Sequence, residues 1–141
     1  MSFWAALKTH GWAYPALEVV HIAGIALVIG NLVLLELRVF GLGRMLPAKE
    51  LARLCLSLTV AGFALIAASG LVMFATQAEE LLANRAFTLK MVLLMLAGCN
   101  AAWFHGRKSL DRLDGMARAL MLVSTILWLA MAASGRWIAY L

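Results

Sequence analysis

Ionisable side chains inside apolar stretches are the residues of this sequence with the clearest chemical potential. Glu18 lies three positions before His21, so a helix would place the carboxylate and the imidazole on one face. Lys90 lies inside another apolar stretch. A charge at the centre of a membrane span costs about 2.5 to 3.5 kcal/mol, so each group should face a partner. We predict a polar cluster of Glu18, His21 and Lys90, in which a Glu18–Lys90 pair fixes helix register or, alternatively, handles protons or ions.

A second polar cluster is expected near the opposite membrane surface. Glu36 falls on the same helical face as His21, within an arc of about 80° at roughly 100° per residue. Asn100 and His105 similarly share a face with Lys90. Because the two stretches run in the same direction, Glu36, Asn100 and His105 should lie together, separated from the first cluster by the apolar interior. We interpret this second cluster as an interfacial network rather than a reaction centre.

His21 could also bind haem b, because a neutral imidazole nitrogen is an axial ligand of haem iron. The cofactor-binding candidates are the three histidines, His10, His21 and His105. At about 1.5 Å rise per residue, His21 and His105 lie nearly a membrane thickness apart and cannot share a haem within one chain. Three arrangements stay open: His21 with His10 folded over it, His21 with a non-histidine ligand, and His21 from two subunits across a dimer axis.

Other metal sites have weaker sequence support. The Glu-x-x-His spacing of Glu18 and His21 is found in di-iron bundles, but those bundles use two copies and this chain has one. Met91 and Met95, one helical turn apart, and Met73 could supply thioethers for copper(I). Packing is the commoner role of methionine. A phosphate-binding glycine loop, a metalloprotease motif and a serine elbow are all missing from the sequence, so it does not predict an enzyme.

The elements that must position these residues are transmembrane helices. The chain is 65% hydrophobic and only 13% charged, and its mean hydropathy is +0.93. Soluble proteins are about half apolar. The charged clusters leave four apolar stretches near the roughly 20 residues needed to cross a bilayer. We therefore predict an all-α bundle of four transmembrane helices in a single domain of 141 residues, with spans at approximately 15–40, 52–78, 86–105 and 117–137.

The distribution of basic residues predicts the orientation. Eight of the twelve lysines and arginines lie in or beside the loops after the first and third spans, which places those loops in the cytoplasm and both termini in the periplasm. Trp12, Tyr14 and Trp137 fall on the outer side, where aromatic residues favour the interface, and the segment before Pro15 should lie in that interface. The net charge of +5 is thus a topology signal, and nucleic acid is not an expected partner.

A short repeat suggests that the bundle consists of two similar hairpins. The tetrapeptide at 67–70, Ala-Ala-Ser-Gly, recurs at 132–135. A duplication would relate the hairpins by an axis along the membrane normal. The small residues would also let helices approach closely.

Several motifs stand out along the chain: His-Ile-Ala-Gly at 21–24, Asn31, Glu-Leu-Arg at 36–38, Asn-Arg-Ala-Phe-Thr-Leu-Lys at 84–90, Ala-Gly-Cys-Asn at 97–100 and Phe-His at 104–105. Together they resemble a family of small bacterial four-helix inner-membrane proteins of unknown function. The resemblance covers nearly the whole chain and implies the fold and the membrane location. A more distant likeness is to the membrane domain of CopD-type copper-resistance proteins, which also carry a histidine followed by small residues and are associated with copper handling.

These observations lead to one main functional interpretation and two alternatives. The main one is an accessory protein of the bacterial inner membrane, embedded in the lipid bilayer and working as a homo-oligomer or in a larger membrane complex. The first alternative is a b-type haem protein that transfers electrons through His21. The second is a protein that handles copper or protons in the manner of CopD.

Overall fold

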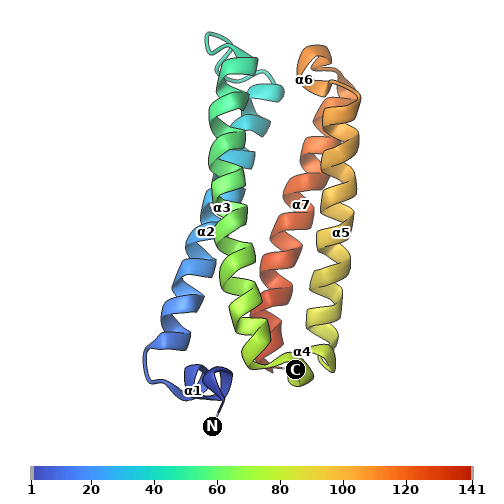
Figure 1. Ribbon diagram of the computed structural model, residues 1–141. Coiled ribbons are helices and arrows are strands. Elements are labelled where there is room, and N and C mark those ends of the chain that lie inside the picture. Colours follow the sequence, from blue (N-terminus) through green and yellow to red (C-terminus); the bar gives the residue numbers. More distant parts are fainter. Residues whose placement is uncertain (1, 141) are drawn as a thin grey trace.

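The computed structural model describes residues 2–140 and contains four long helices that stand side by side (Figure 1). They are α2 (Ala13–Val39), α3 (Ala48–Thr76), α5 (Arg85–Gly106) and α7 (Gly115–Trp137). Each is long and apolar enough to cross a membrane. The expected all-α bundle of four membrane-spanning helices is confirmed, and the protein is a small membrane protein.

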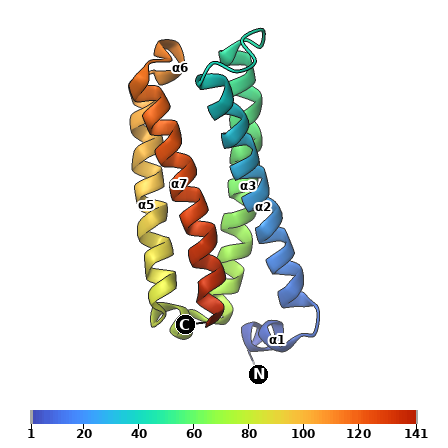
Figure 2. The ribbon, with the colours of Figure 1, turned by 180° about the vertical axis from the view of Figure 1, so that it is seen from behind.

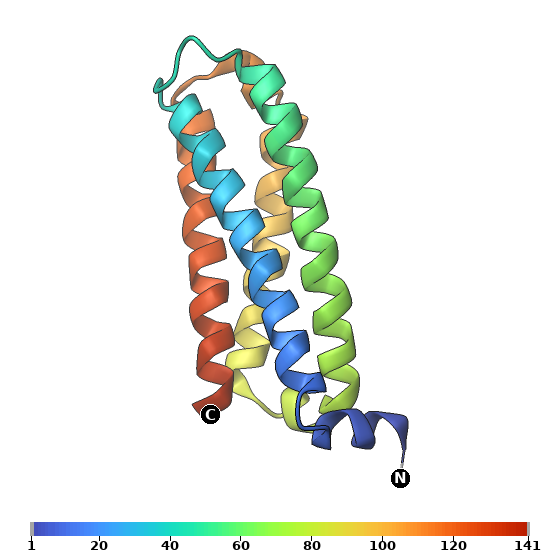
Figure 3. The same ribbon diagram turned by 90° about the vertical axis from the view of Figure 1, so that its left-hand side faces the viewer.

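Short helices close the two ends of the bundle. We call the end with both termini the terminal end and the opposite end, with the two connections 40–47 and 107–114, the loop end (Figure 1). At the terminal end lie α1 (Phe3–Thr9), α4 (Ala78–Leu82) and the 3-10 helix η1 (Ile138–Tyr140), and at the loop end lies α6 (Ser109–Arg112). No residue of α1 is buried, and this helix lies across the end of the bundle (Figure 3).

Local sequence explains where the helices begin and end. The Asn84 side chain accepts hydrogen bonds from the first backbone amides of α5, and the Asp114 side chain accepts one from Ala117 in the first turn of α7. After α2, Gly41 and Gly43 adopt φ angles of 103° and 62°, which favour glycine. The observed helices begin up to four residues before the expected spans, because Pro15 and the charged residues around Lys49 fit a first helical turn.

Close packing joins α2 to α3 and α5 to α7, which makes two hairpins. Within the first hairpin, a Cβ added at Gly24 would lie 2.7 Å from the Gly62 carbonyl oxygen, so the two backbones touch there. Contacts of α2 with α7 join the hairpins, whereas α3 and α5 approach each other only loosely. As a result α2 and α5 stand at opposite corners of the bundle (Figures 2 and 3).

The two hairpins also match in sequence when their helices are aligned residue by residue. Without gaps, 21–38 aligns with 90–107, and 52–70 aligns with 117–135. Identical pairs include Asn31/Asn100, Arg38/Arg107, Ala52/Ala117, Arg53/Arg118 and Ser69/Ser134. Buried positions coincide in the same register, at 28/97, 35/104, 52/117, 55/120 and 69/134. The hairpins are therefore similar in both sequence and burial, as the repeated tetrapeptide indicated.

The largest apolar core lies toward the loop end and draws on all four long helices. It contains Leu35, Val39, Ala52, Cys55, Phe104, Ala117, Leu120 and Met121. The many exposed apolar side chains elsewhere suit a lipid environment, in which they need no protein partner. This core packs the loop end, whereas the terminal half combines apolar contacts, such as the stacking of Phe74 on Phe87, with the polar contacts described next.

Candidate functional site

Three polar side chains meet inside the terminal half of the bundle, and we call them the His21 cluster. His21 Nδ1 lies 3.0 Å from Ser69 Oγ, and His21 Nε2 lies 3.3 Å from Lys90 Nζ. The three residues belong to α2, α3 and α5. Ser69 is 3% exposed. The cluster thus links the two hairpins across the diagonal of the bundle.

The hydrogen atoms available in the His21 cluster fix the direction of its hydrogen bonds. The Ser69 hydroxyl has one proton, and it donates to the Leu65 carbonyl oxygen at 2.6 Å, with the Ile66 carbonyl at 3.2 Å. Ser69 must therefore accept from His21 Nδ1, which leaves the Nε2 lone pair to accept from the Lys90 ammonium. The result is a chain of donors from Lys90 through a neutral His21 to Ser69 and the α3 backbone.

Two equivalent glycines make room for this cluster. A Cβ added at Gly70 would lie 3.3 Å from His21 Cε1, and one at Gly135 would lie 3.1 Å from Lys90 Nζ. Gly70 and Gly135 close the two copies of the repeated tetrapeptide. The repeat therefore has the same role in each hairpin: its glycine accommodates the polar side chain contributed by the neighbouring helix.

The structure brings Lys90 to His21 and not to Glu18. Glu18 is exposed. Within residues 2–140 the ion pairs are Lys8–Glu80, Lys49–Asp111 and Arg107–Asp114, so none joins Glu18 to Lys90. The sequence reasoning also missed Ser69, although the repeated tetrapeptide that contains it was a usable signal.

The residues expected to form a second cluster do not form one network. Glu36 is buried, and its carboxylate accepts a hydrogen bond from the Thr125 hydroxyl of α7. Asn100 donates to the Leu120 carbonyl oxygen at 3.0 Å. His105 is exposed and faces α3 across an opening. Each of the three residues on α2 and α5 thus points to a different neighbour, and Thr125 was not identified from the sequence.

The donor atoms do not fit a haem or a copper site. His21 Nδ1–H donates to Ser69, and the single lone pair of the neutral ring, on Nε2, is directed to Lys90, so it is not offered to iron. His10 lies in the exposed link before α2 and packs edge-to-face on Trp12, while His105 lies at the other end of the bundle. Met91 and Met95 are exposed. Within residues 2–140 no three His, Cys, Asp or Glu side chains are grouped to hold a metal ion.

Comparison of the chain with protein-family models, with curated proteins and with solved structures finds no match.

Proposed function

We propose that this protein is a small accessory membrane subunit whose internal polar residues hold its own two hairpins together. One observation carries the proposal: His21, Ser69 and Lys90 bond to one another and to the α3 backbone, with partners from both hairpins. A catalytic or transport site would need such groups directed toward a substrate. Among residues 2–140, no fully buried side-chain nitrogen or oxygen lacks a hydrogen-bond partner.

An accessory role implies assembly, either with further copies of the chain or within a larger membrane complex. Assembly is tested by counting the photobleaching steps of a fluorescently tagged chain in native membranes at natural expression levels. We expect several copies per spot, or one copy that comigrates in a fixed ratio with another membrane protein. Single, independently diffusing chains would contradict the proposal.

We further propose that the terminal end faces the periplasm of a bacterial cell and the loop end faces the cytoplasm. The basic residues around both loops support this orientation. In a chain with Cys55→Ser and Cys99→Ser, single cysteines at Met45 and at Tyr140 report on the two ends, because both residues are exposed. An impermeant maleimide added to intact cells should label Tyr140→Cys only. Labelling of Met45→Cys instead would invert the topology.

A proton-responsive role is the second candidate, and the His21–Lys90 contact favours it. Protonation of His21 removes the Nε2 lone pair and places two cations 3.3 Å apart, so the hairpins should separate. The series of hydrogen bonds from Lys90 through His21 and Ser69 ends at a backbone carbonyl oxygen. This arrangement suits a response to protons rather than the conduction of protons. Spin labels on Cys99 and on Leu58→Cys, in a chain with Cys55→Ser, should move apart in acid, and His21→Gln should abolish the change. A distance independent of pH would reject this role.

Absorption and elemental analysis of the purified protein test the haem and copper alternatives. The accessory proposal expects no stoichiometric haem or copper after expression with ample supply of both. Two results would replace the proposal. Haem with split bands on reduction would indicate electron transfer, and bound copper would indicate copper handling, if the ligand is lost in His21→Ala and retained in His10→Ala.

A further inference from the structure

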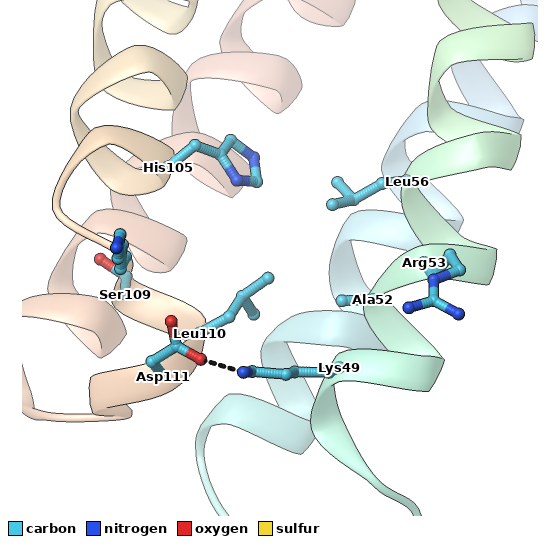
Figure 4. A pocket seen from close by; sticks show the side chains of 9 residues that line it. Lys49, Ala52, Arg53, Leu56, His105, Ser109, Leu110 and Asp111 are labelled. Atoms are coloured by element: carbon cyan, nitrogen blue, oxygen red, sulfur yellow. Dashed lines mark ion pairs between the residues drawn. The ribbon is translucent and has the colours of Figure 1, made fainter.

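An opening at the loop end separates α3 from α5 and α6. Its volume is about 330 Å³, and Figure 4 shows His105 and Leu56 facing it from opposite sides, with the Lys49–Asp111 ion pair toward the loops. The lining consists of Lys49, Ala52, Arg53, Leu56, His105, Lys108, Ser109, Leu110 and Asp111. His105 and Leu56 thus form the inner part of this opening, and the charged Lys49 and Asp111 lie toward the loops. We call it the α3/α5 opening.

The internal repeat explains why the bundle is open on this side. On the closed side, Glu36 of α2 meets Thr125 of α7. In the aligned register, the equivalent of Glu36 is His105 on α5, and the equivalent of Thr125 is Val60 on α3. Val60 is 68% exposed, so the second interface is not made. The α3/α5 opening is therefore the unfilled counterpart of the α2/α7 contact.

The rim of the opening is positively charged on balance. Lys49 and Asp111 form a 2.5 Å ion pair, and Lys49 holds the pKa of the Asp111 carboxyl below its usual value, chiefly by this hydrogen bond. Arg53 and Lys108 take part in none of the ion pairs found in the part of the chain that the structure describes. Two cations on the rim are thus available to an anion.

The loop that carries Lys108 is held in place by its neighbours. The Arg107 guanidinium donates to both carboxylate oxygens of Asp114 at 3.1 and 2.8 Å, and also to the Ser109 hydroxyl at 2.9 Å. Ser109 is fully buried. Lys108 itself adopts φ 56°, a left-handed conformation that L side chains rarely take. The backbone position from which the Lys108 side chain extends is therefore defined before any ligand binds.

We propose that the α3/α5 opening binds one anionic phospholipid, with its phosphate at Arg53 and Lys108 and an acyl chain against Leu56 and Val60. The charge of the rim is complementary to a phosphate, and basic pockets between membrane helices are known to take such headgroups. A phospholipid fits better than free phosphate because apolar side chains adjoin the cations and α3 and α5 are membrane-spanning helices. The lipid occupies the space that helix packing leaves open.

The test measures the thermal midpoint of detergent-purified, delipidated protein during titration with phosphatidylglycerol. A ligand that binds the folded state raises this midpoint in a concentration-dependent way. Phosphatidylcholine, which has no net charge, is the first control. We expect phosphatidylglycerol to bind at least tenfold more tightly than phosphatidylcholine. Equal affinity for the two lipids would overturn the proposal.

Variants locate the site. Arg53→Gln and Lys108→Gly should each weaken phosphatidylglycerol binding about fivefold, the effect expected for one basic residue near an anionic headgroup. Glycine at 108 accepts the left-handed backbone, so this variant loses the charge without strain. Arg85→Gln, at the terminal end, is the matched control and should not change the affinity. Equal weakening in all three variants would show unspecific attraction and would contradict the site.

Asp111→Asn and inorganic phosphate distinguish the ligand classes. Asp111→Asn frees Lys49 and removes a negative charge, so lipid affinity should rise, whereas a cation site would be weakened. Inorganic phosphate at millimolar concentration should neither raise the midpoint nor displace the lipid. If phosphate alone binds and competes, the opening is a site for a soluble anion and the lipid assignment is wrong.

Discussion

His21 and Lys90 occupy equivalent positions in the two hairpins and meet at 3.3 Å across the diagonal of the bundle. Residues that a twofold repeat brings together at its axis are ordinarily the same residue. Two lysines there would repel each other, but a lysine donor and a neutral histidine acceptor form a hydrogen bond. Because the two repeats carry different residues at this position, the two side chains form a hydrogen bond that joins the hairpins instead of repelling each other.

The His21–Lys90 contact predicts energetic coupling between the two positions. In a double-mutant cycle of His21→Leu and Lys90→Met, we expect a coupling of about 1 kcal/mol in the free energy of unfolding, in the range measured for polar contacts between membrane helices. Reversible unfolding in mixed micelles gives the four values. A matched cycle of Glu18→Gln with Lys90→Met should show no coupling, because Glu18 is exposed and makes no ion pair with Lys90. The reverse pattern would contradict the geometry of the cluster.

The backbone contact between α2 and α3 predicts that Gly24→Ala is destabilising. The new Cβ would lie 2.7 Å from the Gly62 carbonyl oxygen, which cannot move without shifting α3, so a loss of about 1 to 3 kcal/mol is expected. Gly30→Ala on the same helix is the control, since a Cβ there meets nothing within 4 Å. It should be neutral or stabilise by up to about 1 kcal/mol through helix propensity. Equal effects in the two variants would argue against close packing at Gly24.

The buried carboxylate of Glu36 predicts sensitivity to its partner on α7. Thr125→Val keeps the shape of the side chain and removes the hydroxyl that donates to Glu36, so we expect a loss of about 1 to 3 kcal/mol in the free energy of unfolding. Thr59→Val is the matched control, because that hydroxyl donates only to the Cys55 carbonyl oxygen of its own helix. Its effect should stay below about 1 kcal/mol. If Glu36→Gln removes the difference between the two variants, the carboxylate is the group responsible.

The start of α7 predicts a dependence of stability on pH. Hydrogen bonds from Arg107, followed by one from the Ala117 amide, hold the pKa of Asp114 far below its usual value of about 3.9. The ionised carboxylate therefore stabilises the folded state above that usual value, and this contribution is lost progressively as the pH falls toward the folded pKa. Thermal midpoints of the wild type should decline below about pH 4, and those of Asp114→Asn should be lower at neutral pH and decline less. Parallel pH profiles would exclude Asp114 as the cause.

Sequence by itself determined the helices, because their formation in lipid depends on local properties. Four apolar stretches must satisfy their backbone hydrogen bonds internally, which requires helices. Asn84 and Asp114 mark where two of these helices begin, and the glycines after α2 mark where that helix ends. The helical face of His21 and the depth of Lys90 also followed from spacing alone. The repeated tetrapeptide indicated two similar hairpins before any contact was known.

Tertiary structure alone decided which polar groups meet. Glu18 and His21 share a face within the wide arc that sequence periodicity defines, yet only His21 reaches Lys90, and Ser69 completes the cluster from a third helix. Likewise, the alignment of Glu36 with His105 does not reveal that one interface closes on Thr125 while the other stays open. Periodicity fixes a direction around one helix axis, but a contact also requires the separation and rotation of a second helix, which depend on packing at distant positions such as Gly24 and Gly62.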